Sequence, residues 1–237
     1  MTTVRSFQDL RLGIKTKASI VVVVLAFFIL IADSYAGIFG PLLAYLYGSI
    51  PFGWMFAKAR TGKDISKEGS GNLGVANSFN VAGYSEGIFT IVTEASKALL
   101  PLTISYFFFD LDLELSCVLI AGSFLGANFS LFIRFQGGMG VTIALWSMLI
   151  LSPLTFIIVM VLMFVILKTV KDTYHASLLN FAIAPLILLV VDGRTPLFLL
   201  ALFIAAIFFL KYRRSMDEFR LRDEMKRRRA ESRQRDR

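Results

Sequence analysis

The chain has 237 residues, of which 56% are hydrophobic, a mean hydropathy of +0.69 and a formal net charge of +8. The apolar residues fall in blocks separated by short polar stretches, which excludes an ordinary soluble domain and indicates helices that cross a bilayer. One cysteine and one histidine exclude a disulfide framework and argue against a metal site, so we expect no metal and no cofactor. The basic residues flank the apolar blocks, so they indicate a membrane and no nucleic acid.

Eight apolar segments follow one another along the chain. They are Ala18–Ala32, Tyr35–Ala57, Ile88–Phe109, Leu115–Ile133, Val141–Leu151, Leu154–Leu167, Ala176–Val191 and Pro196–Leu210. A spanning helix needs about 20 residues, so the fifth and sixth are short, and Pro153 separates them as a tight helical hairpin or a re-entrant pair. The first is also short and is either a span or a signal-anchor extension, without the pattern of a removed signal peptide.

The distribution of basic residues predicts the orientation. If the N-terminus lies inside and the segments alternate, nearly every Lys and Arg falls on the inner side, and only Arg194 falls outside. The acidic turn with Asp110, Asp112 and Glu114 also falls outside. We therefore expect a multi-pass protein of the cell membrane with both termini in the cytoplasm.

Three regions are expected along the chain. Residues 1–33 form a cytoplasmic segment with an extra apolar helix, residues 34–210 a membrane domain, and residues 211–237 a basic tail. The tail has 12 Lys/Arg and 6 Asp/Glu, a net +6, in a mixture that favours a helix with i,i+4 ion pairs. Its charge either attracts anionic lipid or serves as a solvated inner anchor.

Glycine-rich stretches on the predicted inner face are the candidate site. The stretch from Asp64 to Asn77 contains three glycines that permit positive φ and would turn N–H groups toward one point, with donors from Ser70 and Asn72. A second run, FQGGMG, precedes the apolar segment at Val141, where a helix N-terminus also favours an anion. These glycines either bind phosphate or permit close helix packing.

Three other ionisable residues have structural interpretations. Glu94 and Lys97 lie on one face of the third segment at i,i+3, which favours a structural ion pair over a catalytic one. His175 is a lone interfacial histidine, which is more often structural than a general base.

The stretches GSIPFGW, DISKEGSGNLGVAN and GANFSLFIRFQGGMGVT, in this order and spacing, resemble the bacterial acyl-phosphate:glycerol-3-phosphate acyltransferases of the PlsY type. The resemblance covers roughly residues 35–219. It implies an all-α membrane fold with about seven family-type spans, an extra N-terminal segment, cytoplasmic glycine loops and a charged C-terminal helix. It also implies transfer of an acyl chain from acyl-phosphate to glycerol 3-phosphate in phospholipid biosynthesis, among membrane lipids.

The resemblance implies site residues as well. Ser49 and Asn128 would be catalytic, with Ser49 hydrogen-bonding a substrate. The Gly69–Asn77 loop would hold glycerol 3-phosphate, and the Gly137–Gly140 turn would meet the second phosphate. The implied substrate-binding residues are Lys67, Gly69, Ser70, Gly71, Asn72, Gly74, Asn77, Arg134, Gly137, Gly138, Gly140 and Arg213.

Several positions depart from the family pattern. Ser66 stands where a basic residue is usual, Ala127 where a histidine is usual, and Gln136 and Met139 where lysines are usual. In the third motif Tyr212 and Ser215 replace a histidine and an asparagine. Each charged hydrogen bond lost would cost about 1.5–3 kcal/mol, unless nearby basic residues partly substitute, namely Lys63, Lys67, Arg134, Arg213 and Arg214. Three hypotheses follow: an active acyltransferase, an inactive homologue that binds lipid or a partner, and a transporter or channel. Against the third, the sequence shows no obvious inverted repeat.

Overall fold

The computed structural model describes residues 35–170 and 173–211 together with the single positions 19 and 22, and every regular element in these ranges is helical. The elements are α2 (Tyr35–Gly48), α3 (Phe52–Thr61), α4 (Val75–Val81), α5 (Tyr84–Phe109), α6 (Leu113–Asn128), η1 (Leu131–Ile133), α7 (Val141–Leu151), α8 (Pro153–Val170), α9 (Thr173–Val191) and a further helix, Thr195–Lys211. The all-α prediction is confirmed. Apart from positions 19 and 22, the segment Ala18–Ala32 lies outside the described residues, and so do Arg213 and the rest of the basic tail after Lys211.

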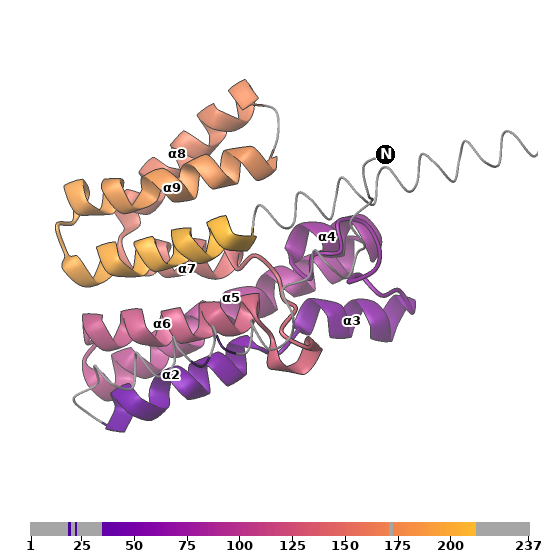
Figure 1. The fold of residues 1–237 in the computed structure, drawn as a ribbon, viewed down its shortest axis with the longest axis horizontal. Helices are drawn as coiled ribbons and strands as arrows, with labels where there is room; N and C mark the ends of the chain where they lie inside the picture. Colours follow the sequence, from indigo (N-terminus) through magenta and orange to yellow (C-terminus); the bar gives the residue numbers. More distant parts are fainter. Residues whose placement is uncertain (1–18, 20–21, 23–34, 171–172, 212–237) are drawn as a thin grey trace, which may run out of the picture.

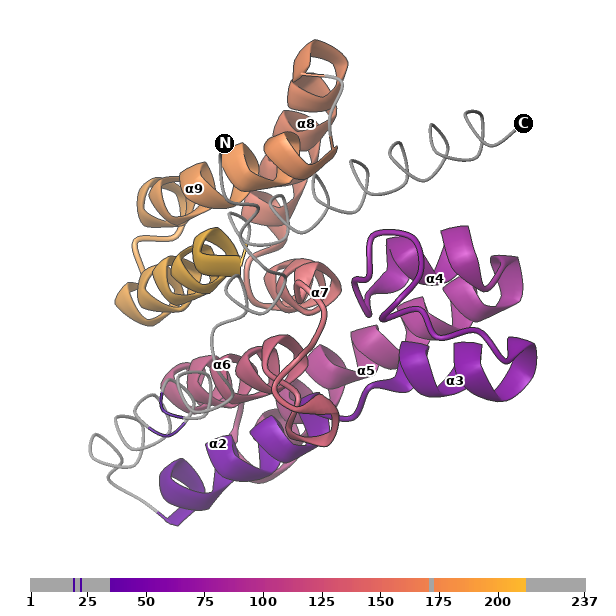
Figure 2. The ribbon, with the colours of Figure 1, turned by 45° about the vertical axis from the view of Figure 1, so that its right-hand side comes forward.

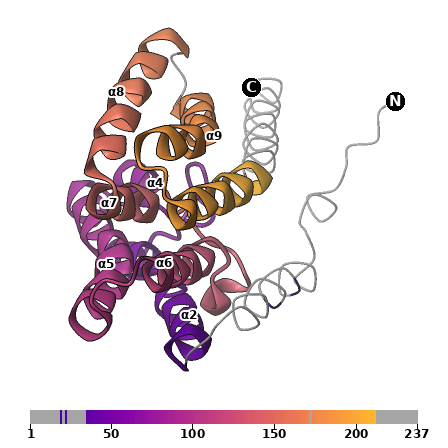
Figure 3. The same ribbon diagram turned by 90° about the vertical axis from the view of Figure 1, so that its left-hand side faces the viewer.

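The long helices form a layered bundle (Figure 1). Helices α2, α5 and α6 pack together, α7 packs on α5 and α8, and α8 packs on α9. Helix Thr195–Lys211 lies between α6 and α9 (Figure 3), where Phe203 contacts Phe124 of α6 and Phe208 contacts Phe181 of α9. The short helices α3 and α4 lie together at one end of the bundle (Figure 2).

The helix boundaries differ from the predicted segments in two informative places. The predicted segment Tyr35–Ala57 is broken at Ser49–Pro51: α2 ends at Gly48, and α3 begins at Phe52 with Pro51 as its N-cap residue. The predicted Leu154–Leu167 is part of a longer helix of 18 residues, α8, which starts at Pro153. The proline begins α8, as expected at a first helical position.

The surface and the interior have the polarity expected of a bundle in lipid. Large apolar side chains point outward, for example Phe107 and Phe108 of α5 and Phe164 of α8, each at least 60% exposed. Inside, serine hydroxyls join helices, as where Ser105 and Ser116 lie 2.8 Å apart. Two described helices, Tyr84–Phe109 and Leu113–Ile133, are long and apolar enough to cross a membrane by length and composition.

Small residues bring α2 and α6 into backbone contact. A Cβ on Gly48 would lie 2.1 Å from the carbonyl oxygen of Ser123, and one on Gly126 would lie 2.1 Å from that of Tyr45. One on Gly122 would lie 2.5 Å from the oxygen of Pro41. The hypothesis that glycines serve close packing therefore holds for this interface, which fixes the end of α2 where Ser49 lies.

A polar cluster closes the end of the bundle opposite α3 and α4. Asp192 accepts hydrogen bonds from Ser152, from Thr155 at 3.0 Å and from Arg194 at 2.7 Å. Arg194 also donates to the carbonyl of Leu151 at 2.8 Å. The cluster ties the α7–α8 junction to the turn that follows α9.

Candidate active site

The Gly69–Asn77 loop is organised by Asn77, which is 2% exposed. Its Nδ2 lies 2.8, 3.1 and 2.9 Å from the carbonyl oxygens of Ile65, Glu68 and Asn72, and its Oδ1 accepts from the amide of Ser70 at 3.0 Å. Because the hydrogen bonds of the Asn77 amide all go to backbone atoms of the loop, this side chain holds the loop in its conformation. The Asn77 amide thus makes four of the hydrogen bonds that hold the loop in shape.

The glycines of this loop have different conformations. Gly69 and Gly71 take positive φ, 58° and 72°, as predicted. A Cβ on Gly69 would also lie 2.2 Å from Asn77 Oδ1. Gly74 departs from the prediction: with φ −85° it is extended and precedes the first turn of α4, and its amide donates to Asn72 Oδ1 at 3.1 Å.

Asp64 anchors the start of the loop. Its Oδ1 accepts from the Ser66 hydroxyl at 2.6 Å and from Trp54 Nε1 at 2.9 Å, and Lys67 lies 3.3 Å from Oδ2. The Ser66 hydroxyl, then Trp54 and Lys67, hold the pKa of the Asp64 carboxyl at about 2 despite its partial burial. The carboxylate is therefore charged throughout the physiological range. Ser66, at a usually basic position, supports this anchor.

The Gly137–Gly140 turn rests on the end of α6. A Cβ on Gly137 would lie 2.1 and 2.7 Å from the carbonyl oxygens of Ala127 and Asn128, so only glycine fits without a shift. Gly140 has φ 70° and immediately precedes α7, as predicted for a helix start. The turn therefore presents the unpaired first amides of α7 beside α6.

The two glycine motifs meet. A Cβ on Gly138 would make ordinary contact with Asn72 Oδ1 and with the amide nitrogen of Gly74, each at 3.6 Å. The structure thus brings together stretches more than 60 residues apart in sequence, as a site for two phosphates requires.

Two buried polar atoms at the ends of α2 and α6, Ser49 Oγ and Asn128 Oδ1, have no partner of hydrogen-bond geometry among the described residues, and both residues have 0% exposure; Asn180 Oδ1 on α9 is a third such atom. The Ser49 carbonyl accepts from the Ser130 hydroxyl at 2.5 Å, and Asn128 Nδ2 donates to Phe124 at 2.9 Å. Buried polar atoms are nearly always paired, so an unpaired one calls for an explanation. A substrate group is one explanation for both atoms.

The basic side chains that the sequence singled out lie in different parts of the structure. Lys67 is 80% exposed and pairs with Asp64, and Arg134 is exposed in a left-handed backbone conformation with φ 48°. Glu94 and Lys97 form the predicted ion pair, 2.6 Å apart and nearly buried. Lys97 Nζ also lies 5.6 Å from the Phe52 ring, close to the break after α2.

Lys211 contacts the site, and the sequence interpretation missed it. Its Nζ donates to the carbonyls of Asn128 at 2.8 Å, Gly137 at 3.0 Å and Gly138 at 2.5 Å. In the sequence it is the first basic residue after the last apolar segment. A basic residue is expected at that position whenever the last helix ends on the inner side of a membrane. No local pattern distinguishes such an anchor from a site residue.

The chain is similar to known proteins in both sequence and structure. The family model for glycerol-3-phosphate acyltransferase matches residues 38–221. Among named relatives, the glycerol-3-phosphate acyltransferase of Listeria monocytogenes is 35% identical over 187 residues, covering 78% of this chain and 93% of the relative. That of Geobacter sulfurreducens is 34% identical over 178 residues, covering 75% of this chain and 91% of the relative.

Solved structures agree. PlsY (YgiH), an integral membrane glycerol 3-phosphate acyltransferase, superposes in its glycerol 3-phosphate form with a TM-score of 0.68 at 28% identity, covering 76% of this chain and 89% of that one. Its lysophosphatidic acid form gives a TM-score of 0.65 at 26% identity over the same shares. These matches give no specific support to an inactive homologue.

Proposed function

This chain belongs to the glycerol-3-phosphate acyltransferase family, and from that premise we propose that it transfers an acyl chain from acyl-phosphate to glycerol 3-phosphate in the membrane. The product is lysophosphatidic acid, an intermediate of phospholipid biosynthesis. The observation that carries the proposal is the junction of the two glycine motifs, where Gly138 lies against Asn72 and Gly74. Two phosphate-bearing substrates need two adjacent anion sites.

The reaction needs little chemistry from side chains. The 1-hydroxyl oxygen of glycerol 3-phosphate attacks the acyl carbonyl carbon, the bond from that carbon to the phosphate oxygen breaks, and the departing phosphate takes up the hydroxyl proton. Phosphate is a good leaving group, so orientation supplies much of the acceleration. Amides of the glycine turns, aimed at the phosphates, stabilise developing charge.

Each predicted site residue has a place in this proposal. The loop from Gly69 to Gly74 holds glycerol 3-phosphate, with Ser70 and Asn72 as side-chain donors and Asn77 holding the loop in shape. The Gly137–Gly140 turn receives the phosphate of the donor. Of the three buried polar side-chain atoms without a described partner, we assign Ser49 Oγ and Asn128 Oδ1, which lie near the glycine motifs, to substrate groups; the third, Asn180 Oδ1, lies on α9. Lys67 and Arg134 add positive charge from the exposed rim, and Arg213 is proposed for the same role.

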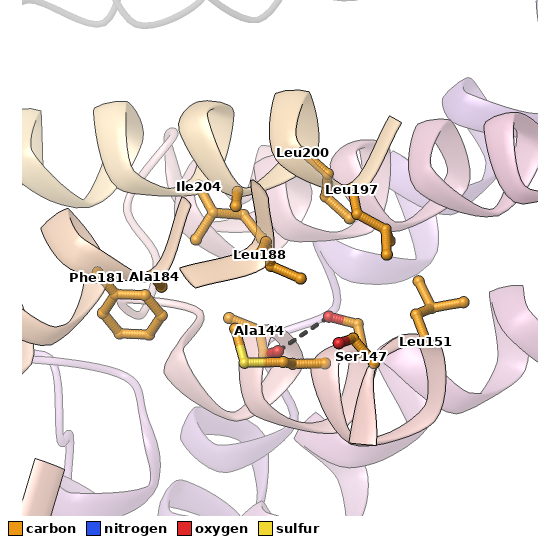
Figure 4. A pocket seen from close by; sticks show the side chains of 12 residues that line it. Ala144, Ser147, Leu151, Phe181, Ala184, Leu188, Leu197, Leu200 and Ile204 are labelled. Carbon is orange, nitrogen blue, oxygen red and sulfur yellow. Dashed lines mark hydrogen bonds between the residues drawn. The ribbon is translucent and has the colours of Figure 1, made fainter. Parts of the chain in front are cut away.

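We assign the acyl chain to an apolar pocket close to the Gly137–Gly140 turn. The pocket is lined by side chains of α7, α9 and helix Thr195–Lys211 (Figure 4). Its lining begins at Ala144, about 6 Å along α7 from Gly140 at 1.5 Å per residue, and extends to Leu151. An acyl chain entering there would place its carbonyl end toward the Gly137–Gly140 turn.

We also propose that residues 34–210 are the membrane domain and that the α3–α4 end faces the cytoplasm, with both termini on that side. Lys58 and Arg60 belong to α3, and Lys63 and Lys67 to the loop between α3 and α4, which lie at one end of the bundle (Figure 1). Lys211 of the last helix contacts the Gly137–Gly140 turn, which lies against this loop. The acidic α5–α6 turn lies at the opposite end. This separation of charge supports the positive-inside orientation.

The donor is tested by offering two activated acyl groups to the purified protein with labelled glycerol 3-phosphate. We expect lysophosphatidic acid from palmitoyl-phosphate and at least about 100-fold less from palmitoyl-coenzyme A, which cannot place a phosphate next to its carbonyl. Equal transfer from both donors would contradict the assignment of the Gly137–Gly140 turn to the donor phosphate.

A further inference from the structure

Lys211 reaches the Gly137–Gly140 turn from a distant part of the chain. An ammonium has three N–H donors, and Lys211 Nζ has three carbonyl acceptors within 3.0 Å, on Asn128, Gly137 and Gly138. The first of these is the last residue of α6, and the other two belong to the turn. Lys211 therefore joins three elements: helix Thr195–Lys211, the end of α6 and the turn before α7.

These bonds determine where the amides of the turn point. A peptide unit is planar and trans, so its N–H points opposite to its C=O. No described peptide bond is cis. With the carbonyls of Gly137 and Gly138 directed at Lys211, the amides of Gly138 and Met139 point away from it. Within residues 35–170 and 173–211, neither amide donates to another group.

The turn has no basic side chain of its own to orient it. Between Phe135 and Val141 the sequence reads QGGMG. Glycine peptides are conformationally free, so a turn of this composition is held only by contacts from outside it. Gly137 is fixed on one side by the end of α6, and Lys211 supplies the fixing contact for the carbonyls.

We propose that Lys211 is a positioning residue that holds the Gly137–Gly138 peptides so that the Gly138 and Met139 amides face the donor phosphate. This rests on the proposed function of the turn as the donor-phosphate site. Lys211 acts through the turn, because its donors are directed at carbonyls. It is the described cation that contacts this turn directly.

Three variants of the full chain in nanodiscs test the proposal. Lys211→Met removes the donors and keeps the side-chain length, and Lys211→Arg keeps donors. Lys168→Met is the matched control, because Lys168 Nζ lies 4.6 Å from the Phe164 ring near the end of α8, as Lys211 Nζ lies 5.6 Å from the Phe129 ring, but Lys168 is away from the turn. The measurements are the KM for palmitoyl-phosphate, the KM for glycerol 3-phosphate and the inhibition constant of inorganic phosphate.

The expected result is selective. Lys211→Met raises the KM for palmitoyl-phosphate and the inhibition constant of phosphate by about tenfold or more, since the Gly138 and Met139 amides are no longer held toward the phosphate and their hydrogen bonds to this charged group are lost. In Lys211→Met the KM for glycerol 3-phosphate stays within about twofold of wild type. In Lys168→Met the KM for palmitoyl-phosphate and the inhibition constant of phosphate also stay within about twofold, and Lys211→Arg recovers most of the loss. Unchanged constants, or an equal rise in both KM values, would overturn the proposal.

A separate readout distinguishes this proposal from the proposed function. Hydrogen exchange of the peptide covering residues 136–143 is followed with and without inorganic phosphate. We expect phosphate to protect these amides in the wild-type chain and not in Lys211→Met. If the wild-type chain transfers no acyl group but shows this Lys211-dependent protection, the enzyme proposal fails and the positioning role stands. Equal protection in both chains would refute the positioning role.

Discussion

Asn77→Ala is expected to raise the KM for glycerol 3-phosphate by about tenfold or more. The substitution removes three hydrogen bonds donated to loop carbonyls and one accepted from Ser70. Each buried group left unpaired costs about 1–3 kcal/mol, so the loop loses its defined shape. Gly69 and Gly71, which have positive φ, then keep only the backbone hydrogen bond from Gly71 to Glu68 at 2.9 Å and the bond from the Asn72 amide to the Ser70 hydroxyl.

Asn80→Ala is the matched control for this change. Asn80 is an exposed asparagine three residues further along the same short helix, α4. We expect its KM values to stay within about twofold of wild type, because surface substitutions away from such networks have small effects. A normal KM for glycerol 3-phosphate in Asn77→Ala would show that the loop does not hold this substrate.

Gly126→Ala is expected to destabilise the protein by about 3 kcal/mol or more and to reduce turnover below about a tenth of wild type. Its Cβ would lie 2.1 Å from the Tyr45 carbonyl oxygen and 2.7 Å from the Ser49 amide nitrogen. Both are backbone atoms, which cannot rotate away as a side chain can. Helices α2 and α6 must separate, and Ser49 moves with α2. Thermal unfolding in detergent measures the loss of stability.

Gly40→Ala tests whether the effect comes from backbone contact. Gly40 lies on the same α2–α6 interface, but its Cβ would meet only the flexible end of Leu119, at 2.7 Å. We expect Gly40→Ala to unfold close to the wild-type temperature and to retain activity. Equal losses in both variants would contradict a specific requirement for backbone approach at Ser49.

The sequence predicted the fold better than the details of the site. Long apolar segments and motif order are local signals, and they predicted an all-α bundle and the family. The break of Tyr35–Ala57 at Ser49 was missed, although Pro51 was visible, because an apolar run alone does not show where a helix stops. The break places Ser49, within its motif, directly after the end of α2.

The roles of Asn77 and Lys211 could not be predicted, because each depends on partners set by the tertiary fold. A motif asparagine in a glycine loop suggests a ligand contact, whereas the structure directs its amide into the loop. Lys211 contacts residues 74 and 83 positions away in sequence, Gly137 and Asn128. Neither the spacing nor the charge of the tail indicates such a pairing.

Acyl transfer by the purified protein in liposomes tests the central claim most directly. The wild-type chain and a Ser49→Ala/Asn72→Ala double variant receive palmitoyl-phosphate and labelled glycerol 3-phosphate, with a Ser85→Ala/Asn80→Ala variant at exposed positions as control. We predict lysophosphatidic acid from the wild-type and control chains and at least about 100-fold less from the first variant. No product from folded wild-type protein, or undiminished product from the first variant, would contradict the account.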